Sequence, residues 1–120
     1  DEAVDVIRGL WDVSQRRGVH VDGEHYRVAG AKRGPEPAHE ISIWLGAYKP
    51  RMLRLTGRKA DGWLPSMPYI DLADVPAANE TIDEAAEAAG RDPRAEILQL
   101  SRDAAETLHR LLLGHSGAFR

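Results

Sequence analysis

The turn Gly46-Ala47-Tyr48-Lys49-Pro50-Arg51 has the chemical character of an anion-binding site. It follows an apolar run typical of a strand, and Pro50 suits the first turn of a helix, where its missing N–H costs nothing. Free N–H groups and the positive end of the helix dipole favour phosphate or carboxylate at such a point. Lys49 and Arg51 add cationic donors. The small residues at its start would let a flat ligand approach the backbone.

A plainer interpretation explains the same turn. One pair of small residues is a weak motif, and a tight strand–helix turn with two solvated cations would have the same sequence. The spacing alone favours this plainer interpretation. A ligand site at Gly46, Ala47 and Arg51 stays open as the alternative.

The other residues that could perform chemistry are isolated. Asp61 could be a catalytic acid, but nothing nearby in the sequence completes an acid–base pair, so pairing with Arg58 or capping a turn is the simpler role. Trp44 and Trp63 lie within strand-like runs, where burial is a commoner role than substrate stacking. The histidines lack the spacing of metal ligands on a helix and the sequence has no cysteine, so no metal site is predicted.

Length, composition and charge restrict the class of protein. A chain of 120 residues fits one domain at most, and no apolar run approaches the roughly eighteen residues of a membrane span. Residues 13–60 hold ten Lys/Arg against four Asp/Glu, whereas residues 61–90 hold seven acids and no base. The basic stretch lacks interleaved aromatic residues, so nucleic-acid binding is not expected. With no export signal, the cytoplasm is the expected location.

The first third of the chain predicts a helix and a hairpin. Apolar residues of the segment 2–15 fall on one helical face, and Gly18 ends the pattern. Residues 19–21 and 25–28 are rich in β-formers and flank Asp22-Gly23-Glu24, a strong hairpin signal. Residues 29–40 read as loop.

The remainder predicts alternating strands and helices. The apolar run 41–47 favours a strand buried on both faces, followed by a helix over 50–59 and a second strand over 60–64. Two further helices are predicted over 74–89, with Gly90 following the first, and from Arg91-Asp92-Pro93 to Leu111. A strand–helix–strand unit implies that Trp44 and Trp63 lie on neighbouring parallel strands.

Two parallel strands do not make a stable sheet. A complete (β/α)8 barrel needs about 250 residues, twice the length of this chain. We therefore expect residues 1–120 to be a single partial domain of the α/β class. The other strands would come from a missing N-terminal half, from another copy or from an unusual packing, because open strand edges are otherwise left.

The order of several short motifs resembles the luciferase-like monooxygenases, above all their actinobacterial branch that uses the deazaflavin coenzyme F-420. The resemblance lies in residues 41–47, Pro50-Arg51, Leu53-Arg54-Leu55 and residues 60–65. Flanking support comes from residues 2–12, the hairpin 21–27 and the turn Gly90-Arg91-Asp92-Pro93. Each motif is weak, but together they cover about residues 2–94 in a fairly specific order.

The resemblance implies a fold, a cofactor and a site. The chain would be the C-terminal portion of a (β/α)8 TIM barrel, comprising its last two βα units with a small β-hairpin and a C-terminal helix. It would help to bind coenzyme F-420, or FMN as the alternative, in an oxidoreductase acting on a small-molecule substrate. The implied cofactor-binding residues are Gly46, Ala47, Pro50, Arg51, Met52 and Trp63, with Leu64 and Pro65 at the rim.

Three functions thus remain open at the level of sequence. In the first, the chain is part of a flavin- or deazaflavin-dependent oxidoreductase, inactive by itself because the residues that touch substrate come largely from the other strands. In the second, it is a non-catalytic truncated domain that oligomerises through its exposed strands. In the third, it is a freestanding phosphate-binding module that binds the anion at the turn before Arg51. Catalytic residues are not predicted in any of the three cases.

Overall fold

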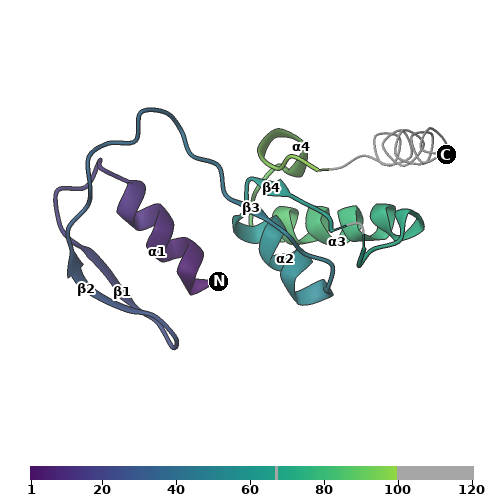
Figure 1. The fold of residues 1–120 in the computed structure, drawn as a ribbon, viewed down its shortest axis with the longest axis horizontal. Helices are drawn as coiled ribbons and strands as arrows, with labels where there is room; N and C mark the ends of the chain where they lie inside the picture. The colour runs from purple at the N-terminus through teal and green to yellow at the C-terminus, as the bar shows by residue number, and fades with distance from the viewer. Residues whose placement is uncertain (67, 100–120) are drawn as a thin grey trace, which may run out of the picture. The chain divides into compact units, whose positions relative to one another are not determined.

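The computed structural model describes residues 1–66 and 68–99, which fall into two compact units (Figure 1). The first unit is Asp1–Ile43, and the second begins at Trp44. No helix among the described residues has both the length and the apolar character needed to cross a membrane.

The first unit is a helix packed on an antiparallel hairpin. Helix α1 spans Glu2–Trp11, strand β1 spans Val19–Asp22 and strand β2 spans Arg27–Ala31. The strands pair with Asp22 opposite Arg27 and Val21 opposite Val28, which confirms the hairpin predicted from Asp22-Gly23. Its second strand continues to Ala31, beyond the predicted end. Helix α1 approaches β1 closely, since a side chain at Gly9 would lie 3.2 Å from Val19.

The first helix ends at Trp11, so the predicted extension to Gln15 is wrong. Asp12 leaves the helical conformation with φ −76° and ψ 91° while its N–H still donates to the carbonyl of Arg8. The Asp12 carboxylate accepts hydrogen bonds from both the backbone N–H and the hydroxyl of Ser14. Local bonds of this kind compete with helical hydrogen bonds, which explains the early end.

The second unit contains the predicted parallel strand pair. Strand β3 spans Trp44–Leu45, helix α2 spans Pro50–Lys59 and strand β4 spans Gly62–Trp63. The register places Trp44 beside Gly62 and Leu45 beside Trp63. The parallel arrangement is therefore confirmed, although each strand has only two residues.

The two tryptophans of this pair differ in burial. Trp63 is 2% exposed, as expected, but the burial expected for Trp44 is wrong because its side chain is 45% exposed. The Trp44 ring lies across Gly62, where an added Cβ would come within 2.6 Å of it. Glycine at the partner position has no side chain with which to cover the indole, so much of Trp44 faces solvent.

Helices α2 and α3 form the body of the second unit (Figure 1). A 3-10 turn, η1 (Leu72–Asp74), leads into α3 (Val75–Ala88), and Gly90 follows in the left-handed conformation with φ +75°, as predicted. The helices approach so closely at Gly57 that an added Cβ would lie 2.2 Å from the Ile82 carbonyl oxygen. The buried core of the second unit combines residues of both helices with residues of the segments around them: Ala47, Leu53, Trp63, Ile70, Val75, Ala78, Ile82, Ala86 and Ile97.

The chain after α3 departs from the sequence prediction. Helix α4 is short, Pro93–Glu96, and Ile97 is extended with φ −127° and ψ 117°. Leu98 then pairs in parallel with Gly62 through Trp63 N–H to Leu98 O and Leu98 N–H to Asp61 O, each 2.9 Å. A helix running on through residues 97–99 is thus wrong, because backbone pairing with β4 outweighs helical spacing. Residues 100–111 of that predicted helix lie outside the described chain.

The family resemblance implies that the strand after α2 is the last strand of the barrel. The pairing with Leu98 corrects that expectation. A further extended segment follows β4 and pairs beside it, so β4 is not the last parallel element of the chain. The described residues form a mixed α/β unit with β4 between two parallel neighbours, and they do not close a barrel.

Candidate functional site

The turn after β3 is fixed by a buried hydrogen bond from the neighbouring strand. Ala47 is buried, and its carbonyl oxygen accepts from the indole Nε1 of Trp63 at 2.9 Å. The Leu64 N–H donates to the Leu45 carbonyl at 3.0 Å, which holds the two segments together where they leave the strand pair. The carboxyl ends of β3 and β4 are therefore locked side by side.

Helix α2 begins immediately after this turn. Lys49 is the N-cap, with extended φ −90° and ψ 146°, and Pro50 occupies the first helical position. The Lys49 carbonyl accepts from Met52 and Leu53, both at 3.0 Å. The helix has no side-chain cap bond and no acidic residue in its first turn, so its positive end is not neutralised locally.

The six residues predicted to bind a cofactor divide into two groups. Gly46, Pro50, Arg51 and Met52 are exposed at the turn or the helix start, whereas Ala47 and Trp63 are buried beneath it. A side chain at Gly46 would meet only the Leu64 carbonyl, at an ordinary 3.7 Å, so the backbone there is open to approach. Ala47 and Trp63 shape the turn from within, and the cofactor-binding role of all six stays a prediction.

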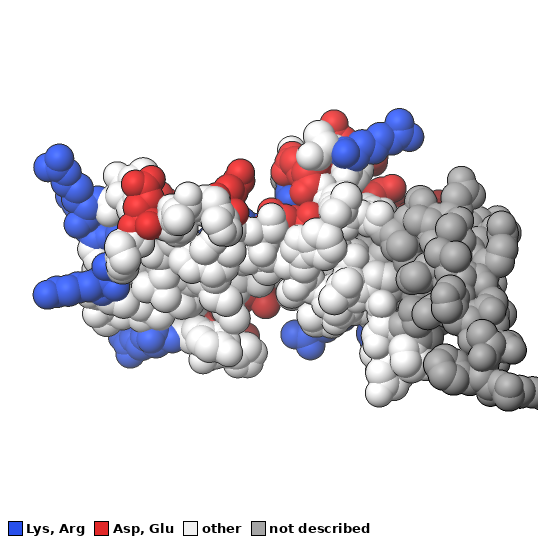
Figure 2. All heavy atoms as spheres, turned by 45° about the horizontal axis from the view of Figure 1, so that its top comes forward, with Lys and Arg blue, Asp and Glu red and all other residues white. Residues whose placement is uncertain are grey.

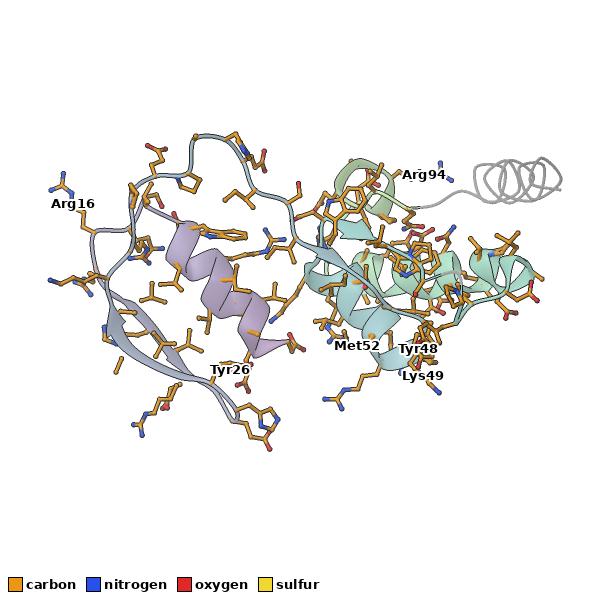
Figure 3. The ribbon with its side chains drawn as sticks, in the orientation of Figure 1. Arg16, Tyr26, Tyr48, Lys49, Met52 and Arg94 are labelled. Carbon is orange, nitrogen blue, oxygen red and sulfur yellow. The ribbon has the colours of Figure 1, made fainter. Side chains whose placement is uncertain are left out.

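The sequence did not reveal the aromatic residues that meet beyond the carboxyl ends of β3 and β4. Tyr48 and Tyr69 stack with ring centroids 5.5 Å apart, and the Lys49 Nζ lies 5.5 Å from the centroid of the Tyr48 ring. Tyr48, Lys49 and Met52 lie around the start of α2 (Figure 3). No periodicity relates residues 48 and 69. The only available signal was that both follow strands predicted to be parallel neighbours.

Away from the turn, many charged side chains are exposed, whereas Arg91 makes structural contacts. Figure 2 shows the Lys and Arg side chains of one face projecting outward in separate groups. Arg91 donates to the Glu96 carboxylate at 2.8 Å, which lowers the pKa of Glu96, and also to the Gly57 carbonyl at 2.8 Å. Within residues 1–66 and 68–99, no three His, Asp or Glu side chains are grouped to hold a metal ion.

Curated relatives share a substantial part of this sequence. A phthiodiolone/phenolphthiodiolone dimycocerosates ketoreductase of Mycobacterium kansasii is 37% identical over 78% of the chain. A 5,10-methylenetetrahydromethanopterin reductase of Archaeoglobus fulgidus is 36% identical over 89% of the chain. These matches cover 25% and 28% of the two relatives, so the chain spans about a quarter of their length.

Solved structures share the fold. An F-420-dependent secondary alcohol dehydrogenase, in complex with an F-420–acetone adduct, aligns with a TM-score of 0.69 and 23% identity, over 80% of this chain and 28% of that one. The coenzyme F-420-dependent tetrahydromethanopterin reductase of Methanopyrus kandleri aligns with a TM-score of 0.62 and 26% identity, over 79% and 26% of the two chains.

The family model described as luciferase-like monooxygenase matches residues 1–106. This match takes in α1, the hairpin, the parallel pair and the helix start that the sequence motifs singled out. The chain belongs to the luciferase-like monooxygenase family.

Proposed function

We propose that the chain forms part of the cofactor pocket of a deazaflavin-dependent oxidoreductase, with coenzyme F-420 as the cofactor and FMN as the alternative. The observation that carries this proposal is the junction where β3 and β4 end side by side and α2 begins. Ligands of parallel α/β folds bind outside the carboxyl ends of the strands. Support also comes from the family and from relatives whose names specify coenzyme F-420.

The residues at this junction fit a ligand that combines a flat ring with a phosphate. The open backbone at Gly46 allows close approach, and the uncapped start of α2 attracts negative charge. Arg51 stands in the first turn of that helix and can add charge-assisted hydrogen bonds. When bound, the cofactor would supply hydride transfer to or from a small-molecule substrate, while the protein positions it.

A complete pocket requires more strands than the described residues provide. We propose that residues 1–120 act as one partial domain of a (β/α)8 barrel, whose other strands come from further βα units or from another copy. The share of each relative covered by this chain supports that arrangement. By this account the chain alone binds cofactor weakly and does not turn over substrate.

A titration tests the proposal. Purified protein is titrated with coenzyme F-420 and with FMN, and binding is followed by absorbance and fluorescence. We expect Arg51→Gln to weaken the affinity roughly tenfold through loss of a charge-assisted contact. Arg94→Gln is the matched control, since it removes an exposed cation from α4 (Figure 3) and should leave the affinity unchanged. A protein that binds neither compound would refute the proposal.

One observation favours the alternative of a non-catalytic domain that oligomerises through its strands. Trp44 on β3 and Leu98 beside β4 are large apolar side chains, 45% and 61% exposed. Exposed apolar strand residues favour pairing with another chain. A colourless protein that binds neither cofactor and forms dimers or larger species in light scattering would support this alternative.

A further inference from the structure

Two exposed tyrosines meet where β3 and β4 end. Tyr48 lies in the turn after β3, Tyr69 lies in the segment after β4, and their ring planes differ by 17°. Tyr48 is 45% exposed and Tyr69 is 68% exposed. Both rings keep much of their surface open in the described residues, and exposed aromatic faces favour stacking with a flat partner.

The backbone beneath both rings is fixed. Ala47, which precedes Tyr48, is buried and held by the Trp63 indole. Ile70, which follows Tyr69, is buried, and the Tyr69 N–H donates to the Ser66 carbonyl at 2.8 Å. The two rings are thus attached beside buried residues, at chain positions that hydrogen bonds hold in place. A surface organised before binding loses little conformational freedom when a ligand arrives.

A positive charge accompanies the ring pair. The Lys49 ammonium lies 5.5 Å from the centroid of the Tyr48 ring, within the range of a cation–π contact. This contact keeps the ammonium close to the aromatic surface. A ligand that stacks a flat conjugated system on the exposed surface of this ring pair and also carries negative charge would match both features.

We propose that Tyr48 and Tyr69 form a stacking platform for the planar ring of an anionic ligand, with Lys49 balancing the ligand's charge. This inference rests on the proposed function and adds to it the residues that select the ligand class. Aromatic side chains bind flat rings through offset stacking, and the ammonium favours acidic rings over neutral ones.

Coenzyme F-420 is the probe for the test. The wild-type protein, Tyr69→Ala and Tyr48→Ala are titrated, and both the dissociation constant and the fluorescence of the bound probe are measured. We expect each alanine variant to bind roughly tenfold more weakly. The bound probe should also fluoresce more brightly in these variants, because a stacked tyrosine quenches its emission. Tyr69→Phe keeps the ring and should retain wild-type affinity.

Tyr26→Ala is the matched control, because Tyr26 is an exposed tyrosine of the first unit (Figure 3). An unchanged dissociation constant in Tyr48→Ala and Tyr69→Ala would overturn the platform. Weaker binding without brighter emission would also overturn it, because the loop would then act without ring contact. A wild-type protein that binds no F-420 refutes the proposed function itself, which separates that failure from failure of the platform alone.

Discussion

The two compact units of this chain are stabilised in different ways. The second unit contains all nine residues of the buried apolar cluster, including the fully enclosed Trp63 and Ile82. In the first unit, Val4, Val19 and Ile43 are buried, but polar contacts connect many of its segments. The candidate site lies on the unit with the apolar core. A rigid core is what a site needs if its loops are to hold a fixed geometry.

Polar contacts in the first unit run from side chains to backbone. The Glu2 carboxylate accepts from the N–H groups of Glu24, His25 and Tyr26, each at 2.8 Å. The Arg33 guanidinium donates to the carbonyls of Gly9, at 2.8 Å, and Gln15, at 3.1 Å, and also to that of Arg17. Charged side chains therefore help to hold the hairpin and its flanking segments. The Glu2 contact depends on pH, whereas apolar packing in the second unit does not.

The largest effect is expected from Trp63→Ala in the second unit. Removal of this enclosed indole should lower the free energy of unfolding by about 3–5 kcal/mol, because a cavity replaces it. Urea unfolding measures the loss. Trp63→Phe keeps most of the burial but loses the bond to the Ala47 carbonyl, so we expect a smaller loss. A loss below about 1 kcal/mol for the alanine variant would show that the cluster around Trp63 is not the core that stabilises the protein.

A second test concerns the approach of α2 to α3. Gly57→Ala should destabilise the protein by about 1–3 kcal/mol, because the new methyl group would collide with the Ile82 carbonyl. Gly34→Ala is the control, since no atom lies within 4 Å of its added Cβ. Thermal unfolding of both variants gives the comparison. Equal stability of the two would mean that the helices can separate without cost.

A smaller and more local effect is expected in the first unit. The N–H groups of His25, Tyr26 and Glu24 hold the pKa of Glu2 below its ordinary value of 4.5. The stabilisation is therefore complete above about pH 4.5 and is lost as the pH falls through the lower pKa of the folded state. The protection factors of the amides of residues 24–26, which are corrected for the intrinsic pH dependence of exchange, should fall over that acidic range.

Glu2→Gln should lower these protection factors already at neutral pH and remove their dependence on acid. Glu24→Gln changes a carboxylate of the same loop that makes no part of this contact, and it serves as the control. If exchange in the two variants were the same, the Glu2 contact would not hold the hairpin.

Local sequence signals predicted much of the second unit. Pro50 and the apolar spacing of residues 50–59 identified α2, and Gly90 marked the end of α3. The parallel pairing of Trp44 and Trp63 followed from the length of the strand–helix–strand connection. These features depend on residues close in sequence or on chain connectivity, which one sequence reveals.

Features that depend on contacts across the chain were not predicted. Leu98 has helical spacing with its neighbours, yet it pairs with Gly62, thirty-six positions earlier. Tyr48 and Tyr69 meet only because two loops leave neighbouring strands at the same end. Trp44 looked like a buried strand residue because sequence does not show that its partner is a glycine.

The central claim is that the carboxyl ends of β3 and β4 open onto one cofactor site. The most direct measurement is a titration of isotope-labelled protein with coenzyme F-420, followed through its backbone amide NMR signals. We expect the signals of Gly46, Ala47, Tyr48, Arg51 and Tyr69 to move, while those of Glu24, His25 and Tyr26 stay in place. Movement confined to the hairpin, or none at saturating coenzyme, would contradict the account.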